Sequence, residues 1–334
     1  MARQKARRTS GLNRKSFQDR FEQIVGNVGQ VIKGKDDIIR LSLVALIADG
    51  HILFEDVPGT GKTMLARALA QTMDIEASRI QCTPDLLPAD VTGSPVLDRK
   101  TGDFIFRPGP VFANIVLADE VNRATPKTQS ALLEAMQERN VTVDAVTYAL
   151  PVPFFVLATQ NPIELAGTFP LPEAQLDRFL FKLTLGYLDR EAEAQVLQVN
   201  RRKEAILDLE PIVDSNDVLE MIDWAQGVGV SDEISYYIID IVQATRSDPS
   251  LQLGASARAS LAFLRASRVL AASQGREDVL PDDVRAIAIP VLAHRLILSP
   301  DAQLREETVE QVIERTMSRV KPPMGVGSRQ PASA

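Results

Sequence analysis

The sequence is poor in the residues that build disulfides and transition-metal sites. It contains one cysteine, Cys82, and two histidines, His51 and His294, among 334 residues. A single cysteine cannot form a disulfide within the chain, and so few thiols and imidazoles exclude a metal site made from them. A disulfide-stabilised fold and a zinc-type centre are therefore not expected.

Long apolar runs are also missing. No stretch approaches the about eighteen uninterrupted apolar residues of a transmembrane helix, and the first residues lack the apolar centre of a signal peptide. We therefore expect a cytoplasmic protein with no transmembrane segment. The length allows two or three domains, and 45% hydrophobic with 24% charged residues is ordinary for a folded globular chain.

Basic residues are fewer than acidic residues in this chain. The formal charge of −7 argues against a surface dominated by nucleic-acid binding, which needs clustered Lys and Arg. We interpret residues 1–16 as a disordered basic tail, in preference to a dedicated nucleic-acid or membrane arm. Residues 321–334, rich in Pro, Gly and Ser, are also predicted to be disordered. The basic residues that precede the first acid, Asp19, are Arg3, Lys5, Arg7, Arg8, Arg14 and Lys15.

The chain is organised around a glycine-rich segment that reads DVPGTGKT over residues 56–63. An apolar run precedes it and a helical pattern follows, so the predicted order is strand, loop, helix. A phosphate-binding loop requires that order, because its backbone N–H groups and the following helix converge on the phosphates. We expect ATP here, with Mg²⁺ as the only metal; Lys62 would neutralise the terminal phosphates and Thr63 would bind Mg²⁺. The predicted nucleotide-binding residues are Pro58, Gly59, Thr60, Gly61, Lys62, Thr63 and Met64.

One position departs from the usual phosphate-binding loop, because Asp56 stands where the first glycine is expected. A carboxylate that pointed at a triphosphate would be repelled by it. We therefore expect Asp56 to point away from the phosphates and to accept hydrogen bonds from N–H groups of the loop.

Two further apolar runs end in polar residues. The run 114–118 is followed by Asp119 and Glu120, and the run 154–160 is followed by Asn161. Buried parallel strands deliver such residues to the edge of the sheet where ligands bind in open α/β folds. We predict that Asp119 orients Mg²⁺ and that Glu120 activates the attacking water as a general base. The Asn161 amide would position that water or the γ-phosphate.

The order of the predicted elements indicates an α/β fold with a parallel sheet. Two β-hairpin insertions, around 94–107 and 140–150, interrupt the alternation of strands and helices. After residue 188 the strand signals stop, so we predict an αβα nucleotide-binding domain over 17–188 and an all-helical lid domain over 189–320. The predicted helices of the lid are 189–204, 215–226, 231–247, 256–273 and 281–295, the last kinked by Pro290.

A helix is also expected over 36–48, with Gly50 as its C-terminal cap. Val31 and Ile32 lie just before this helix. In P-loop ATPases an apolar pair at this place often packs on adenine, although a plain core role explains the pair equally well.

Taken together, these features resemble an AAA+ ATPase, and several strings narrow the resemblance to the MoxR family. The strings follow one another over about residues 17–320, and their combination is far more specific than any one of them. They are DEVNRA at 119–124, KTQSALLEAM at 127–136, ATQNP at 158–162, FPLPEAQLDRF at 169–179 and GASAR at 254–258.

The resemblance implies three further roles. Asn161 corresponds to sensor 1, Arg178 to an arginine finger that acts on a neighbouring subunit, and Arg258 to sensor 2 from the helical lid. For Arg178 the alternative is an ordinary surface salt bridge. At residue 257 the chain has alanine where the family usually has proline, and Arg265 and Arg268 follow on the same predicted helix.

The function implied by the resemblance is a hexameric, chaperone-like ATPase that remodels, matures or activates client proteins, with both hairpins directed to the pore of the ring. Partners in this family often carry a von Willebrand factor A domain. This chain lacks the Asp-x-Ser-x-Ser string of such domains, so a separate partner chain is expected. The alternatives are a nucleic-acid motor, which the acidic composition disfavours, and a nucleotide-switched scaffold, which the complete set of hydrolytic residues disfavours.

Overall fold

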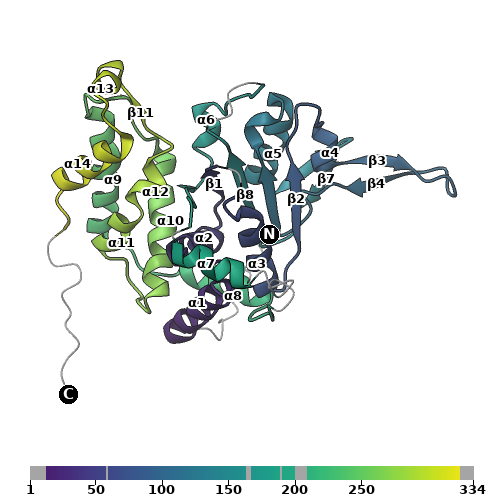
Figure 1. Cartoon of the computed structure of the whole chain (residues 1–334), viewed down its shortest axis with the longest axis horizontal. Helices are drawn as coiled ribbons and strands as arrows, with labels where there is room; N and C mark the ends of the chain where they lie inside the picture. Colours follow the sequence, from purple (N-terminus) through teal and green to yellow (C-terminus); the bar gives the residue numbers. More distant parts are fainter. Residues whose placement is uncertain (1–12, 58, 163–166, 189, 200–208, 324–334) are drawn as a thin grey trace, which may run out of the picture.

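The computed structural model describes residues 13–57, 59–162, 167–188, 190–199 and 209–323. A five-stranded parallel sheet forms the centre of one half of the molecule, and helices make up most of the other half (Figure 1). Because all five strands run in the same direction, their carboxyl ends meet at one edge. In spatial order the strands are β2 (Ala77–Gln81), β5 (Ile115–Asp119), β8 (Phe155–Gln160), β1 (Ile52–Glu55) and β9 (Phe181–Leu183).

Alternate residues of each central strand enter different hydrophobic clusters. On β1, Ile52 and Phe54 pack in a cluster with α1, α2 and α3, whereas Leu53 packs in a second cluster with α4 and α5. Successive side chains of a strand point to opposite faces, so the sheet is buried on both sides. This explains why the central strands β1, β5 and β8 read as apolar runs, whereas the edge strand β2 keeps exposed polar residues. The covering helices are α1 (Arg14–Val28), α2 (Asp36–Ile47) and α3 (Lys62–Thr72) on one face, and α4 (Pro88–Thr92) and α5 (Pro126–Glu138) on the other.

The elements after β9 share their core with the first helices of the chain. Phe263 of α10 and Phe17 of α1 are fully buried in the same hydrophobic cluster. The core is therefore continuous across residue 189, and the division into two domains stays a prediction. In the described ranges, none of the helices combines the length and the apolar character that crossing a membrane requires. The later helices are α7 (Arg190–Val199), α8 (Ser215–Gln226), α9 (Asp232–Ser247), α10 (Ala257–Ser273), α11 (Pro281–Ala286), α12 (Ala288–Leu292), α13 (Pro300–Leu304) and α14 (Val309–Arg319).

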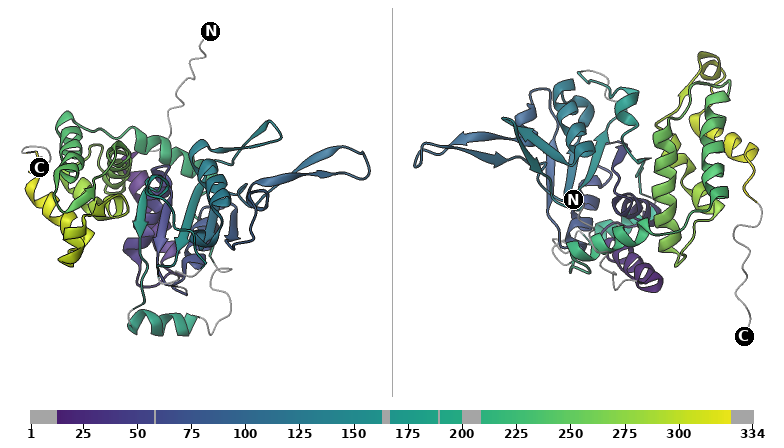
Figure 2. Two further views of the ribbon diagram at one scale, coloured as in Figure 1. Left: turned by 90° about the horizontal axis from the view of Figure 1, so that it is seen from above. Right: turned by 180° about the vertical axis from the view of Figure 1, so that it is seen from behind.

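Both predicted hairpins are present. The first, β3 (Gly93–Leu97) with β4 (Phe104–Pro108), projects far from the rest of the molecule in every view (Figures 1 and 2). The second is β6 (Asn140–Val143) with β7 (Val146–Ala149). Phe106 of the first stacks on Tyr148 of the second, with ring centroids 4.0 Å apart. The two hairpins are thus joined at their bases by aromatic packing.

The prediction of an all-helical region after residue 189 is wrong in one place. β10 (Leu251–Leu253) and β11 (Ile297–Leu298) form a short antiparallel pair. Strands of two or three residues carry no usable periodicity, so sequence patterning does not reveal them. The helix predicted over 281–295 is divided at Ile287, between α11 and α12. Pro290 explains the break, because its ring clashes with the carbonyl four residues earlier, at the end of α11.

Two helix ends also differ from prediction. Residues 14–16, assigned to the disordered tail, begin α1, because Asn13 and Ser16 form a reciprocal capping box with hydrogen bonds of 2.8 and 3.0 Å. Residues 1–12 and 324–334 of the two predicted tails lie outside the described residues. At the end of α2 the left-handed residue is Asp49, with φ of 52°, and not Gly50. Gly50 serves packing instead, since a Cβ there would lie 2.6 Å from the Leu180 side chain.

Two short elements remain to be described. The 3₁₀ helix η1 (Val121–Arg123) follows β5, and α6 (Glu173–Leu176) precedes β9. Both place charged side chains near the cavities described below.

Candidate functional site

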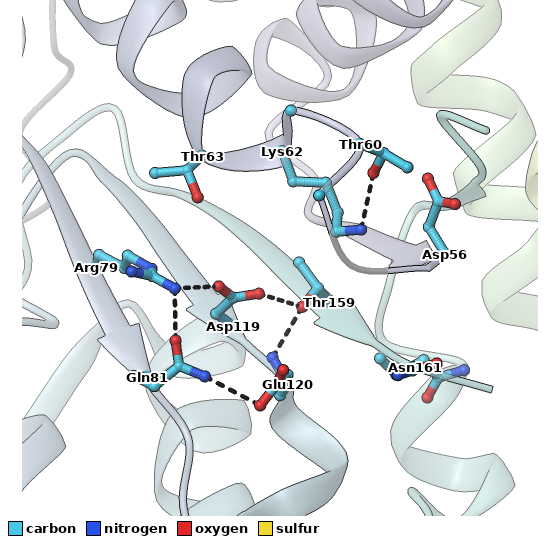
Figure 3. Close-up of a pocket in the computed structure, with 13 residues that line it drawn as sticks. Asp56, Thr60, Lys62, Thr63, Arg79, Gln81, Asp119, Glu120, Thr159 and Asn161 are labelled. Atoms are coloured by element: carbon cyan, nitrogen blue, oxygen red, sulfur yellow. Dashed lines mark hydrogen bonds and ion pairs between the residues drawn. The ribbon is translucent and has the colours of Figure 1, made fainter. Parts of the chain in front are cut away.

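A cavity of about 380 Å³ lies where the carboxyl ends of β1, β5 and β8 face the N-terminus of α3 (Figure 3). We call it cavity 1. It brings together the predicted phosphate-binding loop, the two acids after β5 and the amide after β8. Of the predicted loop residues, Pro58 lies outside the described residues. The lining residues are Asp56, Gly59, Thr60, Gly61, Lys62, Thr63, Arg79, Gln81, Asp119, Glu120, Thr159, Gln160 and Asn161.

The loop owes its shape to two glycines in the left-handed region. Gly59 has φ of 82° and Gly61 has φ of 98°, and a Cβ at either position would meet no atom within 4 Å. The backbone angle, and not a shortage of space, therefore favours glycine at both positions. The open space beside them also lets the main chain approach a ligand closely.

Lys62 is folded back onto the loop. Its Nζ donates to the Val57 carbonyl at 2.8 Å and to the Thr60 hydroxyl at 3.0 Å. Burial lowers the pKa of this ammonium, while the carboxylates of Asp56, Asp119 and Glu120 act in the opposite direction. The charge of Lys62 is thus held inside cavity 1 by loop oxygens that phosphate oxygens can replace.

Asp56 points at the backbone, as predicted. Its Oδ2 accepts hydrogen bonds from the N–H groups of Leu185 and Gly186, both at 3.0 Å, and its Oδ1 accepts one from Val57 at 2.8 Å. The carboxylate therefore ties the phosphate-binding loop to the segment that leaves β9. Sequence reasoning foresaw the backbone hydrogen bonds but not their distant partners.

Thr159 of β8 organises the two acids. Its hydroxyl donates to Asp119 Oδ1 at 2.7 Å and accepts the Glu120 backbone N–H at 2.8 Å (Figure 3). Glu120 has φ of 56°, which turns it out of the strand direction, and its Oε2 accepts from Gln81 at 3.0 Å and Arg123 at 3.1 Å. A single hydroxyl group thus positions the acids at the mouth of the sheet.

Arg79 and Gln81 were missed by sequence reasoning. Both come from β2, and Arg79 donates to Asp119 Oδ2 at 2.6 Å and to Gln81 Oε1 at 2.5 Å (Figure 3). A signal was available, because residues 79 and 81 are polar at a spacing of two and share one face of a strand. Thr159 carried no such signal, since it reads as one more residue of a buried strand.

The donor atoms of cavity 1 fit a magnesium nucleotide. Thr63 contributes a hydroxyl and Asp119 a carboxylate to the same cavity. Mg²⁺ prefers oxygen ligands of this kind, with phosphate oxygens and water completing its shell. The N-terminus of α3 supplies the backbone N–H groups that a polyphosphate needs.

Three predicted nucleotide contacts lie away from the lining of cavity 1. Ile32 is 8% exposed within the hydrophobic core, and Val31 packs against that core. Met64, on the first turn of α3, is 38% exposed. This placement favours the plain core role for Val31 and Ile32.

Arg178 and Arg258 line a different cavity, of about 350 Å³, which we call cavity 2. Arg178 donates from Nε to Gln137 Oε1 at 2.9 Å and from a terminal nitrogen to the Ala174 carbonyl at 3.1 Å. The Arg258 side chain is exposed at the start of α10. The residues that line cavity 2 are Asp49, Gly50, His51, Met136, Gln137, Arg139, Asp177, Arg178, Leu180, Arg258, Leu261, Ala262, Arg265 and Arg295.

The two cavities lie at opposite ends of β1. His51 precedes the strand and lines cavity 2, whereas Asp56 follows it and lines cavity 1. Five residues of extended chain span about 17 Å. The site residues predicted from the sequence therefore fall into two groups, and Arg178 and Arg258 do not line the same cavity as Lys62.

Comparisons with known proteins agree with this geometry. The family model described as "ATPase family associated with various cellular activities (AAA)" matches residues 51–181, and an AAA lid domain model matches residues 243–316. The uncharacterized protein YeaC of Bacillus subtilis is 49% identical over 92% of this chain and 98% of its own length. Chaperone MoxR1 of Mycobacterium tuberculosis is 41% identical over 91% of this chain and 82% of its own.

Two further proteins are similar to this chain over most of its length. Protein MoxR of Paracoccus denitrificans is 32% identical over 87% of this chain and 92% of its own length. A crystal structure of a presumed ATPase from Cytophaga hutchinsonii superposes with a TM-score of 0.87 at 41% identity, covering 93% of this chain and 97% of that one.

Proposed function

Because this chain belongs to the MoxR family of AAA+ ATPases, we propose that cavity 1 binds ATP with Mg²⁺ and that the chain hydrolyses ATP to ADP and phosphate. The main support for the proposal is that the hydroxyl of Thr159 holds the Asp119 carboxylate and the Glu120 backbone at one edge of the sheet. The loop lysine, Lys62, lines the same cavity. A charge-neutralising group and a candidate base are thus set around the place of a terminal phosphate.

Each residue has a distinct part in the proposed reaction. Lys62 exchanges its loop oxygens for phosphate oxygens, and the Glu120 carboxylate takes a proton from the attacking water. The water oxygen bonds to the γ-phosphorus while the bond from that phosphorus to the ADP oxygen breaks. Thr63 and Asp119 would hold Mg²⁺, which neutralises charge on the phosphate oxygens when bound.

Arg178 and Arg258 are proposed to act on the nucleotide of a neighbouring copy in a hexameric ring. Cavity 2 and cavity 1 are separated by the length of β1, about 17 Å by strand geometry. An arginine side chain cannot cover that distance within its own chain. This separation supports a finger role in trans, since an Arg that reaches the transferred phosphoryl group of a neighbour stabilises its developing charge.

The proposed use of the ATPase is chaperone-like remodelling of client proteins, with a von Willebrand factor A domain protein as a separate partner. The name Chaperone MoxR1 of the mycobacterial relative supports this assignment. The first hairpin supports it too, because Val96, Leu97, Phe104 and Ile105 are 46% to 73% exposed on a projecting arm. An exposed apolar arm is suited to contact unfolded or partly folded chains.

Two variants separate binding from chemistry. Lys62→Ala should lose ATP binding, whereas Glu120→Gln should bind MgATP normally and turn over about 10² to 10⁴ times more slowly. The matched control is Glu134→Gln, an exposed carboxylate on α5 that lines neither cavity. Near-normal turnover by Glu120→Gln would remove Glu120 from the role of base.

A further inference from the structure

Cavity 2 contains more positive charge than its carboxylates can balance. Five arginines and two aspartates line it. Asp177 Oδ1 accepts from Arg295 Nε at 2.8 Å and its Oδ2 accepts from the Ser256 hydroxyl at 2.7 Å. Asp49 Oδ1 accepts from Arg139 at 2.7 Å. Both carboxylates are therefore committed to Arg295 and Arg139.

Among the described residues, the other three arginines of cavity 2 have no carboxylate partner. Arg178 donates only to the neutral oxygens of Gln137 and Ala174. In the part of the chain that the structure describes, no hydrogen bond or ion pair engages the guanidinium of Arg258 or Arg265. Three cationic groups thus converge on one cavity without an anion to balance them.

Arg258 and Arg265 share one face of α10. They are seven residues apart, or two turns, so their Cα atoms are separated by about 10 Å along the axis. Leu261 and Ala262 lie between them and also line cavity 2. The spacing suits a ligand with more than one anionic group, because the two guanidinium groups can approach it from successive turns.

Arg265 contributes to the positive potential of the cavity. Burial is the main cause that lowers the pKa of His51, Arg139 and Arg295, the last to about 10, and the charge of Arg265 adds to the lowering for all three. Arg265 also lines cavity 2 itself, so its guanidinium can act on a ligand bound there.

We propose that Arg265 is a third phosphoryl-binding side chain, which with Arg178 and Arg258 lets cavity 2 take the terminal phosphates of a polyphosphate without a metal ion. Guanidinium groups pair with phosphate through parallel N–H donors, and three of them offset most of the charge of such a ligand. The inference rests on the proposed function for the source of the ligand, which is the nucleotide held in cavity 1 of a neighbouring copy.

Binding of tripolyphosphate in the presence of EDTA tests the site itself. The Lys62→Ala chain is used, because its cavity 1 lacks both the loop lysine and a metal. Calorimetry should show saturable binding that weakens about tenfold or more when Arg265→Gln is added, since a hydrogen bond to a charged group is lost. Arg268→Gln, on the same helix but outside the lining of cavity 2, should leave the affinity unchanged.

Absence of tripolyphosphate binding by the Lys62→Ala chain, or equal effects of the Arg265 and Arg268 substitutions, would overturn the proposal. Thermal unfolding of each variant checks that its fold is retained. If wild-type ATP hydrolysis and the loss on Arg178→Ala persist in that case, only the role of Arg265 fails and the proposed function stands.

Mixed assemblies identify the source of the polyphosphate. Arg265→Gln chains and Lys62→Ala chains should each hydrolyse ATP slowly, and mixing them should restore activity if Arg265 serves a neighbour's nucleotide. A different result is informative when tripolyphosphate binds and mixtures of Arg178→Ala with Lys62→Ala regain ATP hydrolysis. If mixtures of Arg265→Gln with Lys62→Ala then regain none, the neighbour's nucleotide is excluded as the ligand of Arg265. A free polyphosphate is then its source.

Discussion

Cavity 1 and cavity 2 have similar volumes, about 380 and 350 Å³, but opposite charge balances. Cavity 1 is lined by three carboxylates and two cations, whereas cavity 2 is lined by two carboxylates and five arginines. A triphosphate brought into cavity 1 needs a metal ion to offset the carboxylates. In cavity 2 the arginines already supply the compensating charge. This difference supports our proposal that the two cavities are complementary parts of one reaction and not two copies of one site.

Their positions indicate how the parts can meet. Parallel strands place ligand-binding residues at their carboxyl edge, where cavity 1 lies, while cavity 2 lies at the amino end of β1. Within one chain the two cannot act on the same phosphate. Between copies they can, provided that the amino edge of one copy faces the carboxyl edge of the next.

The largest expected effect that separates the cavities comes from Arg178→Ala. Turnover should fall by about 10³ to 10⁵, because an arginine that stabilises the transferred phosphoryl group is worth that much. The affinity of cavity 1 for MgATP should stay as in the wild type, measured by equilibrium binding of a fluorescent nucleotide. Arg305→Ala, at the exposed C-cap that follows α13, serves as the control. A parallel loss of affinity would place Arg178 in the nucleotide site of its own chain. Cavity 1 and cavity 2 would then no longer have separate roles.

A smaller effect, confined to cavity 1, should follow from Thr159→Val. The substitution removes the hydroxyl that holds Asp119 and Glu120, so turnover should decrease about 10- to 100-fold, as for other groups that orient a metal site. Tripolyphosphate binding in EDTA should be unaffected, since cavity 2 does not include Thr159. Thr142→Val, which removes a hydroxyl from the second hairpin, is the matched control. Normal steady-state turnover by Thr159→Val would contradict the positioning role.

As the pH falls, the structure around cavity 2 should lose stability before the structure around cavity 1. Burial lowers the pKa of His51 and His294 well below the usual 6.5. His51 lines cavity 2 and accepts the Val156 N–H at Nδ1 while its Nε2 meets the Met136 carbonyl, so it folds as the neutral ring. None of the residues lining cavity 1 is a histidine.

Below about pH 6.5 an unfolded histidine takes up a proton that the folded state does not, so the stability contributed by the neutral rings is present above that pH and is lost as the pH falls. The free energy of unfolding in urea should decrease by up to about 1.4 kcal/mol per pH unit for each histidine between pH 6.5 and 5.5. A flat profile over this range would show that the buried rings do not govern it.

The smallest expected change concerns Asp56, which links the phosphate-binding loop to Leu185 and Gly186. In the wild type, three backbone N–H groups donate to the two carboxylate oxygens of Asp56. The Asp56→Asn side chain has one oxygen, so at least one buried donor loses its acceptor. We expect a loss of about 1 to 3 kcal/mol in the free energy of unfolding, measured in urea beside the exposed control Asp19→Asn. If the two variants were equally stable, the link from the phosphate-binding loop to Leu185 and Gly186 would be energetically unimportant.

The sequence predicted cavity 1 far better than cavity 2. Asp119, Glu120 and Asn161 follow apolar runs, and the carboxyl edge of a parallel sheet must collect them, so local pattern was sufficient. The grouping of Arg178 with Arg258 and Arg265 depends on the tertiary packing that brings α10 close to the residues before β1 and β9. No local pattern encodes that packing. The short strands β10 and β11 were missed for the same reason, since only their pairing identifies them.

Mixing two inactive variants tests the central claim, that cavity 1 of one copy and cavity 2 of the next form one site. Arg178→Ala chains keep an intact cavity 1, and Lys62→Ala chains keep an intact cavity 2. Each alone should hydrolyse ATP very slowly, and mixed assemblies should regain part of the wild-type rate, which itself should rise with protein concentration as copies associate. No recovery in assemblies shown to contain both chains, together with turnover per chain that is independent of concentration, would contradict the account.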